Sequence, residues 1–215
     1  MTALTLTALP LFPLDTVLFP DGVLPLQVFE PRYLDMVGRC QRAGAPFGVV
    51  ALAQGREVRA AGTPPEQLAP IGTLAHIRRL EQPRPGLLLI ECVGGDGFRI
   101  ERSSLLKHGL WVADVSLLAR DTPMAVPDDL HPVAEALRRL LADPRAHLQA
   151  AGAPASDDDE RFDDCGWVAN RWCERLPLPT AARQRLLGID SPLLRLELVA
   201  DLLERAGIGS GPPSP

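Results

Sequence analysis

The sequence predicts an α+β fold in which a β-rich amino-terminal half is followed by a helical carboxy-terminal half. Short apolar runs separated by glycine and proline turns fill the first half. After Thr122-Pro123, apolar residues instead recur at intervals of three and four. The 22 prolines are spread along the chain, which favours many short elements. We expect a β-rich barrel or sandwich over residues 1–120, a helical bundle over 121–206 and a disordered tail over 207–215.

Proline recurs among aliphatic residues in the first thirty positions, where charge is almost absent. Proline fixes φ and donates no backbone hydrogen bond, so a long helix or a central strand is excluded there. We expect strands over residues 5–12 and 23–28, with a turn at Pro20-Asp21-Gly22. A short helix then opens at Glu30-Pro31 and ends at Gly44. Its apolar face has helical spacing and comprises Tyr33, Met36, Val37 and Cys40.

The remaining strands of the β-rich half are bounded by loops and turns. We expect them over residues 47–53, 71–77, 87–93 and 110–118, with a turn at 83–86. The glycine-rich segment 94–97 predicts a bulge or a hairpin before Phe98-Arg-Ile100. This segment leads into a strand and not a helix, so it is not a phosphate-binding loop.

Five segments of the second half have helical or connecting character. Asp129 and Pro132 begin a helix, and residues 152–160 predict a mobile connector. A short helix runs from Pro179-Thr180 to Gly188, where glycine suits a left-handed terminus. In the helix that begins at Asp129 and Pro132, the expected inward face comprises Val133, Leu137, Leu140 and Leu141. In the next long helix it comprises Cys165, Val168, Ala169, Trp172 and Leu176, opposite Asp164, Arg171 and Glu174. In the last helix, after Asp190-Ser191-Pro192, it comprises Leu194, Leu198, Leu202 and Leu203.

One short segment carries the whole net charge of −5. Residues 157–164 hold six acids against Arg161, so the rest of the chain sums to zero. The acidic segment predicts a solvated loop leading into a helix start, where negative charge suits the helix dipole. A neutral body supplies no long-range field to attract phosphate backbones, which argues against general nucleic-acid binding.

The sequence offers no catalytic, metal-binding or cofactor-binding constellation. The four cysteines form no CxxC pair, and the four histidines lack the spacing of a helical metal site. Cys92 with His76 or His108 is the best nucleophile pair, but its apolar surroundings favour a buried core thiol. No signal peptide and no transmembrane segment are evident, so we expect a cytoplasmic protein with reduced thiols and no membrane partner.

Several segments, in this order, resemble the substrate-binding (amino-terminal) domain of Lon proteases. They are the Leu-Pro-Leu run with Phe19-Pro20 and Leu24-Pro25-Leu26; Pro64-Pro-Glu-Gln-Leu with Ile71-Gly-Thr-Leu-Ala-His-Ile77; Gly94 to Ile100; Trp167-Val-Ala-Asn-Arg to Thr180; and Arg185-Leu-Leu-Gly with Arg195-Leu-Glu-Leu. The resemblance spans about residues 5–205. It implies a PUA-like pseudo-barrel followed by a small helical bundle, and a role in handling polypeptides.

The catalytic parts of full Lon proteases are missing from these residues. The sequence has no G-x-x-x-x-G-K-[ST] motif, and its one lysine, Lys107, has no serine in a context that suggests a Ser-Lys dyad. We therefore expect a free-standing recognition domain that is not an enzyme.

Binding is the function that these observations favour. The resemblance implies a module for peptides or unfolded proteins, an adaptor or a sensor, whose partner is a polypeptide segment or a protein such as a protease or chaperone. The candidate contact residues are the aromatics Phe19, Phe29, Tyr33 and Trp111. Each of them is equally a candidate for the core, because the chain has few aromatic residues. The alternative is RNA binding by a PUA-like module through Arg78, Arg79, Arg84 and Arg99.

Overall fold

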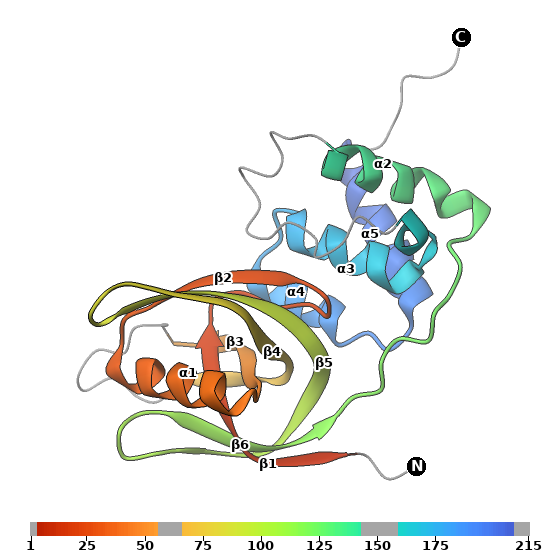
Figure 1. The fold of residues 1–215 in the computed structure, drawn as a ribbon. Helices are drawn as coiled ribbons and strands as arrows, with labels where there is room; N and C mark the ends of the chain where they lie inside the picture. The colour runs from red at the N-terminus through yellow and green to blue at the C-terminus, as the bar shows by residue number, and fades with distance from the viewer. Residues whose placement is uncertain (1–3, 56–65, 143–158, 209–215) are drawn as a thin grey trace.

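A computed structural model describes residues 4–55, 66–142 and 159–208 and divides the chain into a β-barrel and a group of helices (Figure 1). The strands are β1 (Thr5–Leu14), β2 (Val23–Val28), β3 (Phe47–Gln54), β4 (Gln67–Arg84), β5 (Leu87–Leu105) and β6 (Trp111–Leu117). Their order is β2-β5-β4-β3-β1-β6, so β1 is an interior strand although it holds Pro10 and Pro13, and the exclusion of a central strand from the first thirty residues is wrong. Each of these prolines pairs with one strand, Pro10 with β6 and Pro13 with β3. An additional pairing between β5 and β6 closes five of the strands into a ring. The α+β fold, with a PUA-like barrel and helices after it, is confirmed.

The ring closes because β5 is long enough to pair with different strands along its length. Its first part, up to Val93, pairs with β2, and its last part, from Phe98, pairs with β6. All strand pairs are antiparallel except β1 with β3. The sequence predicted two separate strands here, interrupted at Gly94–Gly97. The structure shows a continuous strand with a register shift, so the bulge is confirmed and the hairpin is wrong.

Glycine is required at position 94 by a close approach. A Cβ atom there would lie 2.2 Å from the carbonyl oxygen of Phe19, far inside van der Waals contact. The missing side chain lets the turn before β2 lie directly on β5. The Gly94 amide donates to the Gly22 carbonyl at 2.8 Å, and the Asp21 amide donates to the Gly94 carbonyl at the same distance.

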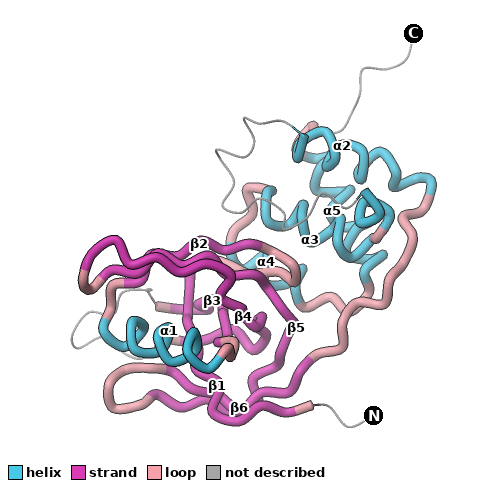
Figure 2. The backbone as a smooth tube through the Cα atoms, in the orientation of Figure 1, coloured by secondary structure: helices cyan, strands magenta, loops and turns pink. Residues whose placement is uncertain are grey.

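The helix α1 (Pro31–Ala43) lies beside the strands, apart from the other helices (Figure 2). Its buried residues are the four predicted from spacing: Tyr33, Met36, Val37 and Cys40. It ends as predicted at Gly44, which has a left-handed φ of 59°. The Tyr33 ring stacks on Phe12 with centroids 4.1 Å apart. The helix and one side of the barrel therefore share one apolar core.

The second half comprises α2 (His131–Ala142), α3 (Cys165–Arg175), α4 (Thr180–Leu187) and α5 (Pro192–Arg205), with short 3-10 turns η1 (Asp128–Leu130) and η3 (Asp159–Asp163). α4 lies against the barrel and contacts β3 and β4 (Figure 1). Gln184 on α4 donates to the Ile71 carbonyl at 2.9 Å, and Thr180 donates to the Asp15 carbonyl at 3.0 Å. The other core combines apolar residues of the barrel and of the helices, so it crosses residue 120.

Three predictions for the helical half are wrong. Arg171 was expected on the polar face of α3 but is 1% exposed. Leu194 and Leu198 were expected to point inward from α5 but are 46% and 37% exposed. Gly188 ends α4 with a φ of −81°, so it does not adopt the left-handed conformation. The predicted connector over 152–160 and the tail over 207–215 lie largely outside the described residues.

Candidate peptide-binding site

β2 is an edge strand of the sheet. It stands at one end of the strand order and pairs only with β5 among the described strands. Its register places Leu24 opposite Cys92, Pro25 opposite Glu91 and Leu26 opposite Ile90. None of its six residues is charged, and Pro25 and Gln27 are exposed. An uncovered edge presents backbone groups that another extended chain can pair with.

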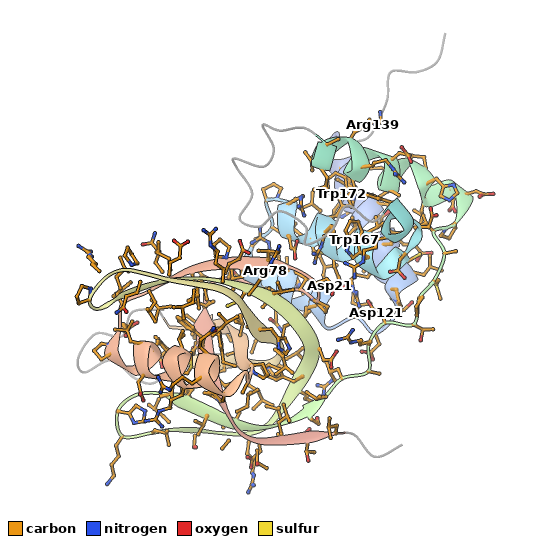
Figure 3. The ribbon with its side chains drawn as sticks, viewed as in Figure 1. Asp21, Arg78, Asp121, Arg139, Trp167 and Trp172 are labelled. Carbon is orange, nitrogen blue, oxygen red and sulfur yellow. The ribbon has the colours of Figure 1, made fainter. Side chains whose placement is uncertain are left out.

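The turn that precedes β2 is held by the helical bundle. Arg171 on α3 donates to the carbonyl of Asp21 at 2.6 Å and to that of Pro20 at 2.7 Å. The same guanidinium pairs with Glu174 at 2.8 Å, and Arg161 pairs with the Asp21 carboxylate at 3.2 Å. Asp21 has a left-handed φ of 60°. In Figure 3, Asp21 and Trp167 mark this junction between the barrel and the bundle.

Glu174 is the acid at the centre of this junction, and its side chain is 19% exposed. Burial raises the pKa of its carboxyl group, and the nearby Arg171 and Arg175 oppose that rise. Gly22 is the residue beneath it, because a Cβ atom there would lie 2.2 Å from Glu174 Oε1. A side chain at position 22 would therefore push the carboxylate away from its arginines.

The far end of β2 carries Phe29, whose ring is 55% exposed. Phe29 stands between β2 and α1, immediately before Glu30. Arg32 fixes this corner: it pairs with Glu30 at 2.9 Å and donates to the Gly109 carbonyl at 2.7 Å. The contacts of Arg32 thus hold the backbone at this corner in place, while Phe29 remains largely exposed to solvent.

The structure does not bring the four predicted contact residues together. Phe19 is 0% exposed and Tyr33 is 3% exposed, so both rings contact the protein's own cores. Trp111 is half-buried, and its Nε1 donates to Glu66 at 3.0 Å. Of the four, Phe29 alone is largely open to solvent.

Sequence reasoning missed the polar junction that positions β2. A signal for Arg171 exists: it follows Trp167 and Val168 at helical spacings of four and three, which puts it next to the apolar face of α3. The sequence also contains a signal for the outward direction of Pro25, because a proline within a strand is found mainly where its nitrogen faces away from the partner strand, at a sheet edge.

The cysteines show the properties of core thiols. All four are buried and unpaired. Burial raises the pKa of Cys92 to about 12 and that of Cys173 to about 12, so both remain protonated at neutral pH. Among the described residues, no group of three or more histidine, cysteine or acidic side chains is placed to hold a metal ion.

The predicted basic face is interleaved with acids. Arg78 lies 3.8 Å from Glu91, and Arg79 pairs with Glu81 on the same strand. Two of the four predicted arginines are therefore balanced by nearby acids, while Arg84 on β4 and Arg99 on β5 are exposed. Arg78 is labelled on the barrel surface in Figure 3.

A closed barrel with one attached edge strand, followed by a helical bundle, defines a protein of the PUA-like class. Residues 8–205 match the family described as the ATP-dependent protease La (LON) substrate-binding domain. The chain belongs to this family. No protease or ATPase domain is identified in its 215 residues.

Individual relatives agree with this assignment. A Lon protease from Trichlorobacter lovleyi is 29% identical over 202 residues, which cover 92% of this chain and 24% of that protein. The chain therefore spans about a quarter of the length of that relative. The crystal structure of a Lon N-terminal domain protein from Xanthomonas campestris is similar with a TM-score of 0.69 at 32% identity, covering 91% of this chain and 98% of that one.

A more distant structure shares the fold. The N-terminal domain of a Mycobacterium avium complex Lon protease has a TM-score of 0.60 at 18% identity, covering 92% of this chain and 98% of that one. No helix in the described part of the chain has the length and apolar character needed to cross a membrane.

Proposed function

We propose that this chain is a non-catalytic recognition module that binds extended, apolar segments of unfolded polypeptides at β2 and Phe29. The family assignment supports binding of substrate polypeptides. The observation that carries the location is the 55% exposure of Phe29 at the end of an uncharged strand that pairs with β5 alone among the described strands. An exposed aromatic ring beside unpaired backbone groups suits a chain that presents both apolar side chains and a free main chain.

The module would act as an adaptor or a sensor. It holds a segment that a folded protein conceals, and a partner such as a protease or chaperone then acts on the captured chain. Long-range electrostatic attraction should contribute little to binding, because the body of the protein outside residues 157–164 is neutral. Affinity therefore depends on apolar burial and backbone pairing, and we expect it to vary little with salt.

The replacement of Phe29 by aspartate tests this proposal. Full burial of a phenylalanine ring stabilises a complex by about 2 kcal/mol, so the Phe29→Asp variant should bind roughly thirtyfold more weakly. The measurement is fluorescence anisotropy with a labelled peptide of about ten residues in which leucine alternates with serine.

Leu194→Asp is the matched control, because Leu194 is also exposed, at 46%, but lies on α5. It introduces the same charge away from β2 and should leave the affinity unchanged. Equal binding by the wild type and the folded Phe29→Asp variant would contradict the proposed location. A wild-type protein that binds no such peptide would contradict the function itself.

A further inference from the structure

The edge of β2 that faces away from β5 has a defined set of backbone groups that pair with no other described strand. In an antiparallel ladder, successive residues direct their N–H and C=O groups alternately toward the partner strand and away from it. The Gly94 amide donates to the Gly22 carbonyl at 2.8 Å, so position 22 faces β5. By alternation, Leu24, Leu26 and Val28 also face β5, while Val23, Pro25 and Gln27 face outward.

Pro25 makes this outward edge chemically asymmetric. Pro25 has a carbonyl acceptor but no N–H donor. Val23 and Gln27, on either side of it along this edge, each offer a donor and an acceptor. Natural edge strands are commonly protected by lysine, by charges or by bulges, and proline serves the same purpose. β2 has no charged residue and no register shift against β5, so Pro25 is its principal protection.

The proline discriminates between two occupants of the edge. A second copy that pairs β2 with β2 symmetrically about Pro25 would place Val23 opposite Gln27 and Pro25 opposite Pro25. Two carbonyls would then face each other without a donor, and each would lose its water on pairing. A foreign strand avoids this conflict when it presents an N–H opposite Pro25.

We propose, building on the proposed function, that β2 takes up a substrate segment as an additional antiparallel strand. The class of ligand is an extended peptide with a non-proline residue opposite Pro25 and an apolar side chain near Phe29. Main-chain pairing makes recognition tolerant of sequence, as a module for unfolded chains requires. Pro25 at the same time disfavours the symmetric self-pairing of this edge in which Pro25 lies opposite Pro25.

Backbone methylation of the peptide tests strand addition without altering the protein. Each position of the alternating leucine–serine peptide is N-methylated singly, and its affinity is measured by anisotropy. Strand addition predicts a loss of about fivefold or more at alternate positions, where an N–H donates to β2, and little change at the intervening ones. A uniform effect, or none, while Phe29→Asp still weakens binding would overturn strand addition and leave the proposed function standing.

Pro25→Val provides a second, independent measurement. Valine fits an edge strand and restores the missing donor, so peptide affinity should rise about threefold to tenfold. The variant should also form concentration-dependent dimers in sedimentation experiments, whereas the wild type should not do so through this edge. A folded variant with unchanged affinity and unchanged association would overturn the role assigned to Pro25. Failure of the wild type to bind any unmethylated peptide would overturn both proposals.

Discussion

Arg171 is the residue on which the orientation of β2 depends most. A buried guanidinium needs partners for its donors, and here the two terminal nitrogens reach two backbone carbonyls and one carboxylate, while Nε has no hydrogen-bond partner among the described residues. Its contacts come from Pro20 and Asp21, some 150 positions away in the chain. The bundle therefore fixes the turn from which the proposed binding strand begins.

The Arg171→Met variant should lose about 3 kcal/mol of unfolding free energy, because the buried Glu174 loses its closest cationic partner and the Pro20 and Asp21 carbonyls lose their donor. Arg139→Met is the control: Arg139 is an exposed arginine on α2, and its replacement should change stability by less than about 0.5 kcal/mol. Urea unfolding followed by circular dichroism measures both. Equal stability of the two variants would show that Arg171 does not hold the junction.

At the scale of the elements, Asp114 on β6 joins three strands of the barrel. It accepts from the Ala8 amide on β1 at 3.1 Å and from Arg102 on β5 at 2.7 Å. Ala8 has a left-handed φ of 54° within a register shift of β1, a conformation that favours glycine. The carboxylate thus stabilises an irregular backbone at the point where the ring closes.

This contact predicts a dependence of stability on pH. The Ala8 amide and then Arg102 lower the pKa of Asp114 below its ordinary value of 3.8. In the unfolded chain the group binds its proton more readily, so its contribution is present above pH 3.8 and is lost as the pH falls through the lower folded value. The unfolding free energy of Asp114→Asn should fall less steeply over this acid range than that of the wild type. Parallel acid profiles would contradict the assignment.

Regular periodicity predicted some elements well and others poorly, for physical reasons. β2 and the buried face of α1 follow directly from apolar spacing and proline placement. α5 does not, because Arg195 takes an inward position to reach Asp121 at 2.7 Å and Asn170 at 2.8 Å. The buried face comprises Arg195, Leu196, Val199 and Leu203, and Leu194 and Leu198 lie outside it. Because Leu196, Val199 and Leu203 also recur at helical spacing, apolar spacing alone does not distinguish this face from the predicted one.

For the whole molecule, the sequence correctly predicted that a barrel precedes a helical bundle. Of the four aromatic residues predicted as peptide contacts, however, only one is largely exposed. Phe19, Tyr33 and Phe29 have similar local surroundings of proline and aliphatic residues. Their exposure differs because Phe19 packs in the core shared by the barrel and the helices and Tyr33 stacks on Phe12, contacts that depend on distant segments. Phe29 belongs to neither core among the described residues and is 55% exposed.

Amide hydrogen exchange at single-residue resolution shows whether a peptide binds along the edge of β2 that faces away from β5. The outward amides of Val23 and Gln27 should exchange fast in the free protein and markedly slower once the leucine–serine peptide is bound. Leu24 and Leu26, which face β5, should change little. Peptide binding that leaves the exchange of Val23 and Gln27 unaltered, or that protects amides of α5 instead, would contradict the account.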